Sequence, residues 1–263
     1  MKPRPHWNVL AASLLAIALV AGGCGKSTRP TNPGGGLNQA SADDIALQTQ
    51  FALNQLDLDV EGGISSIAPT APVRLRPVPL RALWDTTVTV GGLTIQVTRD
   101  FYDAQDQVLP GYGPDAVKLI WTSRIYGSIQ TARDTATVGH SASVEFVGIQ
   151  PTDTAITING AAFDTLLNVF RSYDGTRTRH FYWRSSLTAD DVFWVKTSEW
   201  PKSGTLTFVV KADRLRSNNR GDVEAHLNAT VVITFNGTDH PDVVINGTWH
   251  YKWDMQNGTM VRA

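Results

Sequence analysis

The sequence predicts a mainly β protein, a large antiparallel sandwich or barrel of about ten or eleven strands with one N-terminal helix. From Trp84 onward, apolar and polar side chains alternate, which is the period of a strand with one buried face. Clusters of Gly, Pro, Asn and Asp separate the alternating runs and predict turns. No convincing crossover helix interrupts these runs, so we expect neighbouring strands to be antiparallel.

The first 23 residues have the organisation of a signal peptide. Lys2 and Arg4 give a basic start, residues 9–20 are uncharged and apolar, and residues 21–23 are small and precede Cys24. The apolar run is shorter than the roughly 20 residues that a membrane-spanning helix needs. We therefore predict that residues 1–23 are a leader that is removed and not a membrane anchor.

The residues around Cys24 resemble the lipobox of bacterial lipoproteins, in which a cysteine behind small residues receives lipid and becomes the mature N-terminus. The resemblance implies that Cys24 carries fatty acyl chains such as palmitate, which anchor the protein in the cell envelope. The residue after Cys24 is Gly25 and not Asp, which in enteric-type lipoproteins resembles the outer-membrane sorting state. Residues 25–28 also read as the end of a phosphate-binding loop, but Val20 stands where that loop needs a glycine.

Composition excludes several classes of site and partner. Cys24 is the only cysteine, so the mature chain has no disulfide, no thiol nucleophile and no cysteine-based metal site. Removal of residues 1–23 takes away two of the 23 Lys and Arg residues and none of the 24 Asp and Glu residues. The weakly acidic balance that remains gives no electrostatic reason to expect nucleic acid or an anionic membrane surface as partner. We predict no nucleic-acid partner and no cofactor.

The chain between the leader and the strands divides into two parts. Residues 24–40 are rich in Gly, Pro, Ser and Thr and predict a flexible tether. Residues 41–82 combine an amphipathic helix, capped by Ser41 and ending near Asp57, with a Pro-rich extended connector. The apolar stripe of this helix consists of Ile45, Phe51, Ala52 and Leu56. Residues 83–263 are then expected to form the antiparallel β domain.

Three stretches of the β domain carry specific expectations. Gly91 and Gly92 predict a tight hairpin turn before an alternating strand that starts at Leu93. Residues 161–171 suit a strand or a helix, because their apolar residues also have helical spacing. Residues 192–195 are apolar on both faces, which predicts a central core strand covered on both sides, or a strand that borders an apolar cavity.

The last hairpin is specified most closely. Residues 225–235 and 243–253 both carry apolar side chains at odd positions, so facing residue numbers must add up to an even number. A sum of 476 places Val231 opposite Ile245 and Leu227 opposite Trp249.

The same register places His226 opposite His250 on the polar face. Two imidazoles at strand spacing could hold a metal ion, with Glu224 or Asp254 within reach as a third ligand. Exposed histidines on a polar sheet face are far commoner, so we predict no metal site and keep His226 and His250 as the only candidates.

No catalytic residue is predicted. Residues 139–143 read Gly-His-Ser-Ala-Ser and imitate a nucleophile elbow, but the final glycine is missing and the elbow requires a strand-to-helix turn. Two acidic pairs have the carboxylates that a glycosidase or a calcium site would need, but ordinary turn chemistry explains them. These pairs are Asp190 with Asp191, and Asp239 with Asp242.

These observations favour a lipid-anchored envelope protein, at the outer membrane, with a non-enzymatic role in binding or assembly. Its partners would be the membrane, through the anchor, and an envelope protein or an apolar ligand. One alternative is a carrier of lipid or another apolar ligand, because a helix followed by about eleven antiparallel strands over residues 41–263 is similar to the half-open barrels of lipoprotein-localisation carriers. Another alternative is a hydrolase whose site is assembled from distant segments.

Overall fold

The computed structural model describes residue 46 and residues 86–172, 176–217 and 223–263. Twelve strands are described, and all of them belong to one antiparallel sheet, so the mainly β prediction is confirmed. The strands are β1 (Thr86–Val90), β2 (Leu93–Tyr102), β3 (Val108–Leu109), β4 (Lys118–Gln130), β5 (Asp134–Val147), β6 (Ala155–Arg171), β7 (Thr178–Val195), β8 (Ser203–Ser217), β9 (Val223–Thr234), β10 (Asp242–Ile245), β11 (Trp249–Asp254) and β12 (Thr259–Arg262).

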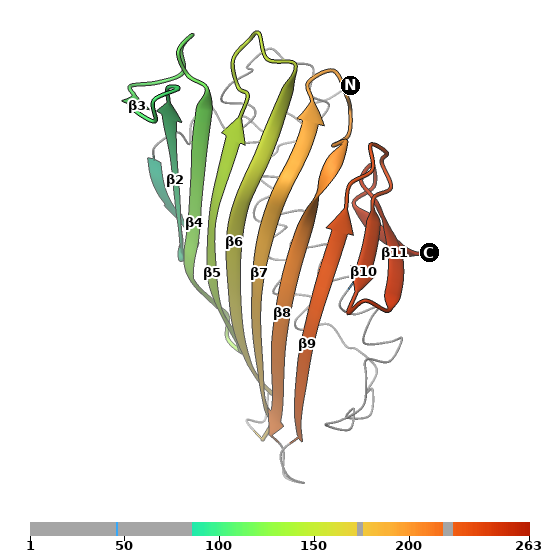
Figure 1. Cartoon of the computed structure of the whole chain (residues 1–263). Coiled ribbons are helices and arrows are strands. Elements are labelled where there is room, and N and C mark those ends of the chain that lie inside the picture. The colour runs from blue at the N-terminus through green and yellow to red at the C-terminus, as the bar shows by residue number, and fades with distance from the viewer. Residues whose placement is uncertain (1–45, 47–85, 173–175, 218–222) are drawn as a thin grey trace, which may run out of the picture.

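The sheet is a meander in which each strand pairs with the next along the chain, except that β3 pairs with β2 alone. The path begins at β1 and ends at β12, and Figure 1 shows the long strands β4 to β9 side by side in one curved layer. The described strands thus form one sheet and not the two stacked sheets of a sandwich. The predicted leader and tether lie outside the described residues. So does the predicted helix, apart from Ala46, which is helical.

One face of the sheet, here called the inner face, carries the apolar side chains. On β5 the even positions point inward, from Ala136 to Phe146, while the odd positions are more exposed. The most completely buried side chains come from strands across the whole sheet: Leu119, Phe146, Phe208, Val231, Ile233, Val243 and Ile245. Outside the sheet and its connections, Ala46 is the only described residue that joins this cluster, and it is 3% exposed.

The alternation of buried and exposed residues decides the structure of residues 161–171 and the covering of residues 192–195. Residues 161–171 lie in β6, where Ala162 and Leu166 are buried and Phe163 is exposed, so the strand period prevails. The expectation that residues 192–195 are covered on both faces is wrong, because the Phe193 ring is 38% exposed on the outer face. A bulge in the β6–β7 ladder, between Ile158 and Gly160, lies next to this stretch.

The last hairpin is partly as predicted. The β9–β10 register does place Val231 opposite Ile245, as the sum of 476 requires. The predicted pair of Leu227 and Trp249 is wrong, because β10 ends at Ile245 and β11 turns back to pair with β10. Asn246 and Gly247 form this turn with φ values of 50° and 67°, the conformation for which Asn-Gly is favoured. What the sequence suggested was one long strand is therefore two short ones.

Candidate functional site

Four polar side chains from four adjacent strands form a continuous hydrogen-bonded row on the inner face. Ser123 on β4 and the imidazole of His140 on β5 are 3.1 Å apart, measured from Oγ to Nε2. The other ring nitrogen, Nδ1, lies 2.7 Å from Oδ1 of Asp164 on β6. Ser185 on β7 donates its hydroxyl to Oδ2 of the same carboxylate at 3.1 Å. We call these four residues the polar row.

Strand register brings the polar row together. Pairing places His140 opposite Asp164 and Asp164 opposite Ser185, so three members lie directly beside one another. Ser123 faces Ala142, one step along the strands, and reaches His140 diagonally. All four positions belong to the inward-facing set of their strands, and a shift of one residue would turn a member to the outer face.

The polar row is buried among small and apolar side chains. Ser123, His140 and Ser185 are 4%, 7% and 1% exposed, and the side chain of Asp164 is 27% exposed. Buried polar groups cost free energy unless they are hydrogen-bonded, and a buried carboxylate costs most. The apolar neighbours on the adjacent cross-strand lines include Val97, Ala142, Ala162 and Leu187 on one side and Leu93, Val138, Leu166 and Trp183 on the other.

The polar row has the donor and acceptor order of a serine nucleophile, a base and an orienting carboxylate. An ionised carboxylate can only accept, so Asp164 fixes the His140 tautomer with the proton on Nδ1 and leaves Nε2 to accept from Ser123. Acyl transfer also needs donors for the developing oxyanion. Both sides of β4 are paired around Ser123, so the backbone N–H groups there belong to the sheet ladders. The described strands around Ser123 therefore leave no backbone N–H group for an oxyanion.

The sequence analysis missed this cluster although its signal was present. His140 occupies an inward position of an alternating run with Val138 and Ala142, which indicated a buried imidazole. The elbow-like serines beside it, Ser141 and Ser143, point to the opposite face and are exposed, so the rejection of the elbow agrees with the structure. The partners of His140 come from strands 17 and 24 residues away, and only the register reveals them.

The predicted pairing of His226 with His250 is wrong. The β8–β9 register places His226 opposite Asp213, and the two side chains are 2.7 Å apart. His250 lies on β11 opposite Val244, because the Asn246-Gly247 turn takes β11 away from β9. Within the described residues no group of three His, Cys, Asp or Glu side chains could hold a metal ion. These two histidines therefore do not form a metal site in this register.

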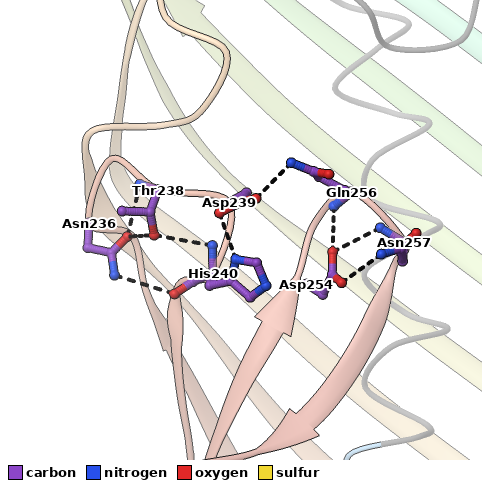
Figure 2. A network of polar contacts seen from close by, with 7 residues as sticks. All are labelled: Asn236, Thr238, Asp239, His240, Asp254, Gln256 and Asn257. Carbon is purple, nitrogen blue, oxygen red and sulfur yellow. Dashed lines mark hydrogen bonds and ion pairs between the residues drawn. The ribbon is translucent and has the colours of Figure 1, made fainter.

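The acidic residues near the C-terminus belong to a network that ties two connections together (Figure 2). In the β9–β10 connection, Asp239 binds the His240 imidazole at 2.6 Å and accepts from Gln256 at 2.7 Å. Gln256 lies in the turn after β11, where Asp254 accepts hydrogen bonds from Asn257. Asp242 instead binds Lys252 on the neighbouring strand. The network cross-links loops and forms no pair of free carboxylates.

Cys24 lies outside the described residues, so its lipidation stays a prediction. In the part of the chain that the structure describes, no helix is long and apolar enough to cross a membrane. No family model, no curated protein and no solved structure matches the chain.

The first prediction concerns Asp164. Its replacement in Asp164→Ala leaves His140 and Ser185 without their acceptor in a buried setting, and we expect the free energy of unfolding to fall by about 3 kcal/mol or more. Asp213→Ala is the matched control, because the His226–Asp213 pair has the same 2.7 Å separation but side chains that are 58% and 42% exposed. That variant should lose less than about 1 kcal/mol. Equal losses in urea unfolding would show that the polar row does not stabilise the fold.

The second prediction concerns the pKa of Asp254. Hydrogen bonds from the Asn257 side chain and backbone, and then from the Gln256 backbone, hold the pKa of Asp254 below its usual value. A lowered pKa means that these contacts stabilise the fold above the ordinary pKa and are lost as pH falls through the lowered one. Asn257→Ala should raise the pKa of Asp254, measured by NMR titration of its carboxyl carbon. Asn236→Ala, which removes a side chain that does not touch Asp254, should leave it unchanged.

Proposed function

We propose that the protein is a lipid-anchored protein of the cell envelope, at the outer membrane, that binds an apolar ligand on the inner face of its sheet. The anchor is the acyl modification expected at Cys24, and the binding role is non-enzymatic. The observation that carries the proposal is that the described strands form one wide sheet with its apolar side chains on a single face. In a sandwich, a second sheet would cover this apolar face.

The width of the face supports a ligand. Strands about 4.8 Å apart give the sheet a width of roughly 50 Å, whereas an α-helix is about 10 Å across. Outside the sheet and its connections, Ala46 is the only described residue that joins the apolar cluster, so the described chain itself covers little of this width. Ala142 and Ala162 face each other near the middle of the inner face, and in this proposal their small side chains are where a ligand chain would lie.

The polar row supplies the specific contact in this account. Binding sites for apolar molecules are largely apolar and contain a few placed polar groups that fix orientation. Ser123, His140 and Ser185 are buried and hydrogen-bonded within the row, and Asp164 is the member that retains enough exposure to accept a hydrogen bond from a ligand. A ligand with an acyl chain and a hydrogen-bonding head group has the matching chemistry.

The third prediction tests ligand binding with the fluorescent fatty acid parinaric acid. Ala162 and Ala161 are neighbours on β6, but only Ala162 is buried on the inner face. Ala162→Phe should weaken parinaric acid binding at least about tenfold, because the ring fills space over the polar row. Ala161→Phe adds the same ring on the outer face and should leave binding unchanged. Absence of binding to the full-length protein, or equal weakening in both variants, would contradict the proposal.

A hydrolase is the second candidate, and one observation favours it, namely the order Ser123, His140, Asp164. An activated Ser123 would be labelled by a fluorophosphonate, the label would be lost in Ser123→Ala, and it would survive in Ser186→Ala on the outer face. Because the strands around Ser123 leave no backbone donors for an oxyanion, we expect no label on Ser123. Stoichiometric labelling at Ser123, found by mass spectrometry of the peptides, would replace the binding proposal with acyl transfer.

A further inference from the structure

The two ends of the sheet differ in charge. One end, at the top of Figure 1, holds the connections β2–β4, β5–β6, β7–β8 and β9–β10. These connections carry the acidic residues Asp103, Asp106, Asp115, Asp153, Glu199 and Asp239, against the basic residues Lys196 and Lys202. The other end holds the connections β4–β5, β6–β7 and β8–β9. Arginine dominates there.

Four described arginines gather at this second end, and we call them the basic end: Arg133, Arg171, Arg177 and Arg179. The first three are exposed and the fourth is half-buried. The backbone N–H of Arg171 donates to the carbonyl of Arg133 at 2.8 Å, which joins the β4–β5 connection to the end of β6. The β6–β7 connection is closed between Ser172 and Arg177, because the Ser172 N–H donates to the Arg177 carbonyl and the Arg177 N–H donates to the Ser172 hydroxyl, each at 3.0 Å. The four arginines therefore lie on a common rim.

The register adds to this charge. Arg214 and Arg216 occupy positions on β8 opposite Phe181 and Arg179. The described acidic residues towards the same end are Asp134, whose carboxylate accepts from Asn168, Asp213, which binds His226, and Glu224 on β9. Among the described residues, arginines therefore outnumber acidic residues at this end.

Apolar groups accompany the arginines. The Arg179 guanidinium lies 5.8 Å from the centroid of the Phe170 ring, and Phe181 packs only partly against the core. On the outer face near the same end, the side chains of Leu167 and Leu215 are 39% and 36% exposed. Cations mixed with apolar and aromatic side chains suit a bilayer interface, where the charge meets phosphate and the apolar groups meet the upper acyl region. A nucleic acid backbone would use the charge alone.

We propose that the basic end is a docking surface for an anionic lipid bilayer. Positive charge at one end and negative charge at the other orient the molecule in the field of an anionic surface, with the strands running away from it. This contact goes beyond the proposed ligand, because it requires no occupant of the inner face. It would place the rim of the apolar inner face, where Phe170 and Phe181 lie, at the membrane surface.

The fourth prediction follows from this proposal and uses the full chain. Co-sedimentation is measured with vesicles of phosphatidylglycerol and phosphatidylcholine and, in parallel, with vesicles of phosphatidylcholine alone. The anchor or leader contributes to binding of both kinds of vesicle. The ratio of the two partition constants therefore measures the effect of the lipid charge. Near 50 mM salt we expect a preference for the anionic vesicles that Arg171→Glu/Arg177→Glu reduces at least about tenfold.

The control is Lys202→Glu/Arg262→Glu, which changes the net charge equally at two exposed positions away from the basic end. It should keep most of the preference, whereas an equal loss would mean that net charge alone acts and would overturn the proposal. Full displacement of the protein from anionic vesicles by duplex DNA at equal phosphate would assign the surface to nucleic acid and overturn it too. Because parinaric acid binding is measured without vesicles, failure here leaves the inner-face proposal standing, and the reverse also holds.

Discussion

The register of the strands is the constraint on which the rest of the structure depends. A strand presents successive side chains to opposite faces, so the inner face is apolar only if every ladder keeps its phase. From Leu119 on β4, through Phe146 and Ile158, to Val192 on β7, each pairing keeps the inward positions together, and the bulge beside Ile158 preserves this phase. A slip of one residue in a ladder would turn the inward side chains of the shifted strand to the outer face.

The polar row makes the central register specific as well as favourable. Apolar side chains tolerate many partners, but His140 and Asp164 have few acceptable ones in a buried setting. In the observed register His140 and Asp164 bind each other across adjacent strands, and Ser185 donates a hydrogen bond to the second carboxylate oxygen of Asp164. In a register shifted by two residues, which keeps the faces intact, Asp164 would lie opposite Val138 or Ala142 and would lose the imidazole. The polar row therefore distinguishes between registers that the apolar pattern alone cannot separate.

The difference between what the apolar pattern determines and what the polar row determines explains how far the sequence predicted the fold and the site. Alternation and turn residues together predicted the strands, the hairpin at Gly91 and Gly92 and the pairing of Val231 with Ile245. The prediction failed beyond Ile245, because a continuous apolar phase does not reveal that Asn246 and Gly247 reverse the chain. The polar row could not be predicted, since His140 and Asp164 acquire their relation only from the pairing of β5 and β6. The charge difference between the two ends was hidden in the same way, because opposite charges cancel in the net balance. The lipid anchor at Cys24 lies outside the described residues and stays a prediction.

NMR contacts between an acyl chain and the alanine methyls of β6 test the central claim most directly. With full-length protein and a fatty acid, nuclear Overhauser contacts should connect the chain to the methyl groups of Ala162 and Ala142. They should be absent at Ala161, which is exposed on the opposite face of the same strand. Contacts to Ala161, or to none of the three methyls at saturating fatty acid, would contradict the account of an apolar inner face that binds a ligand over the polar row.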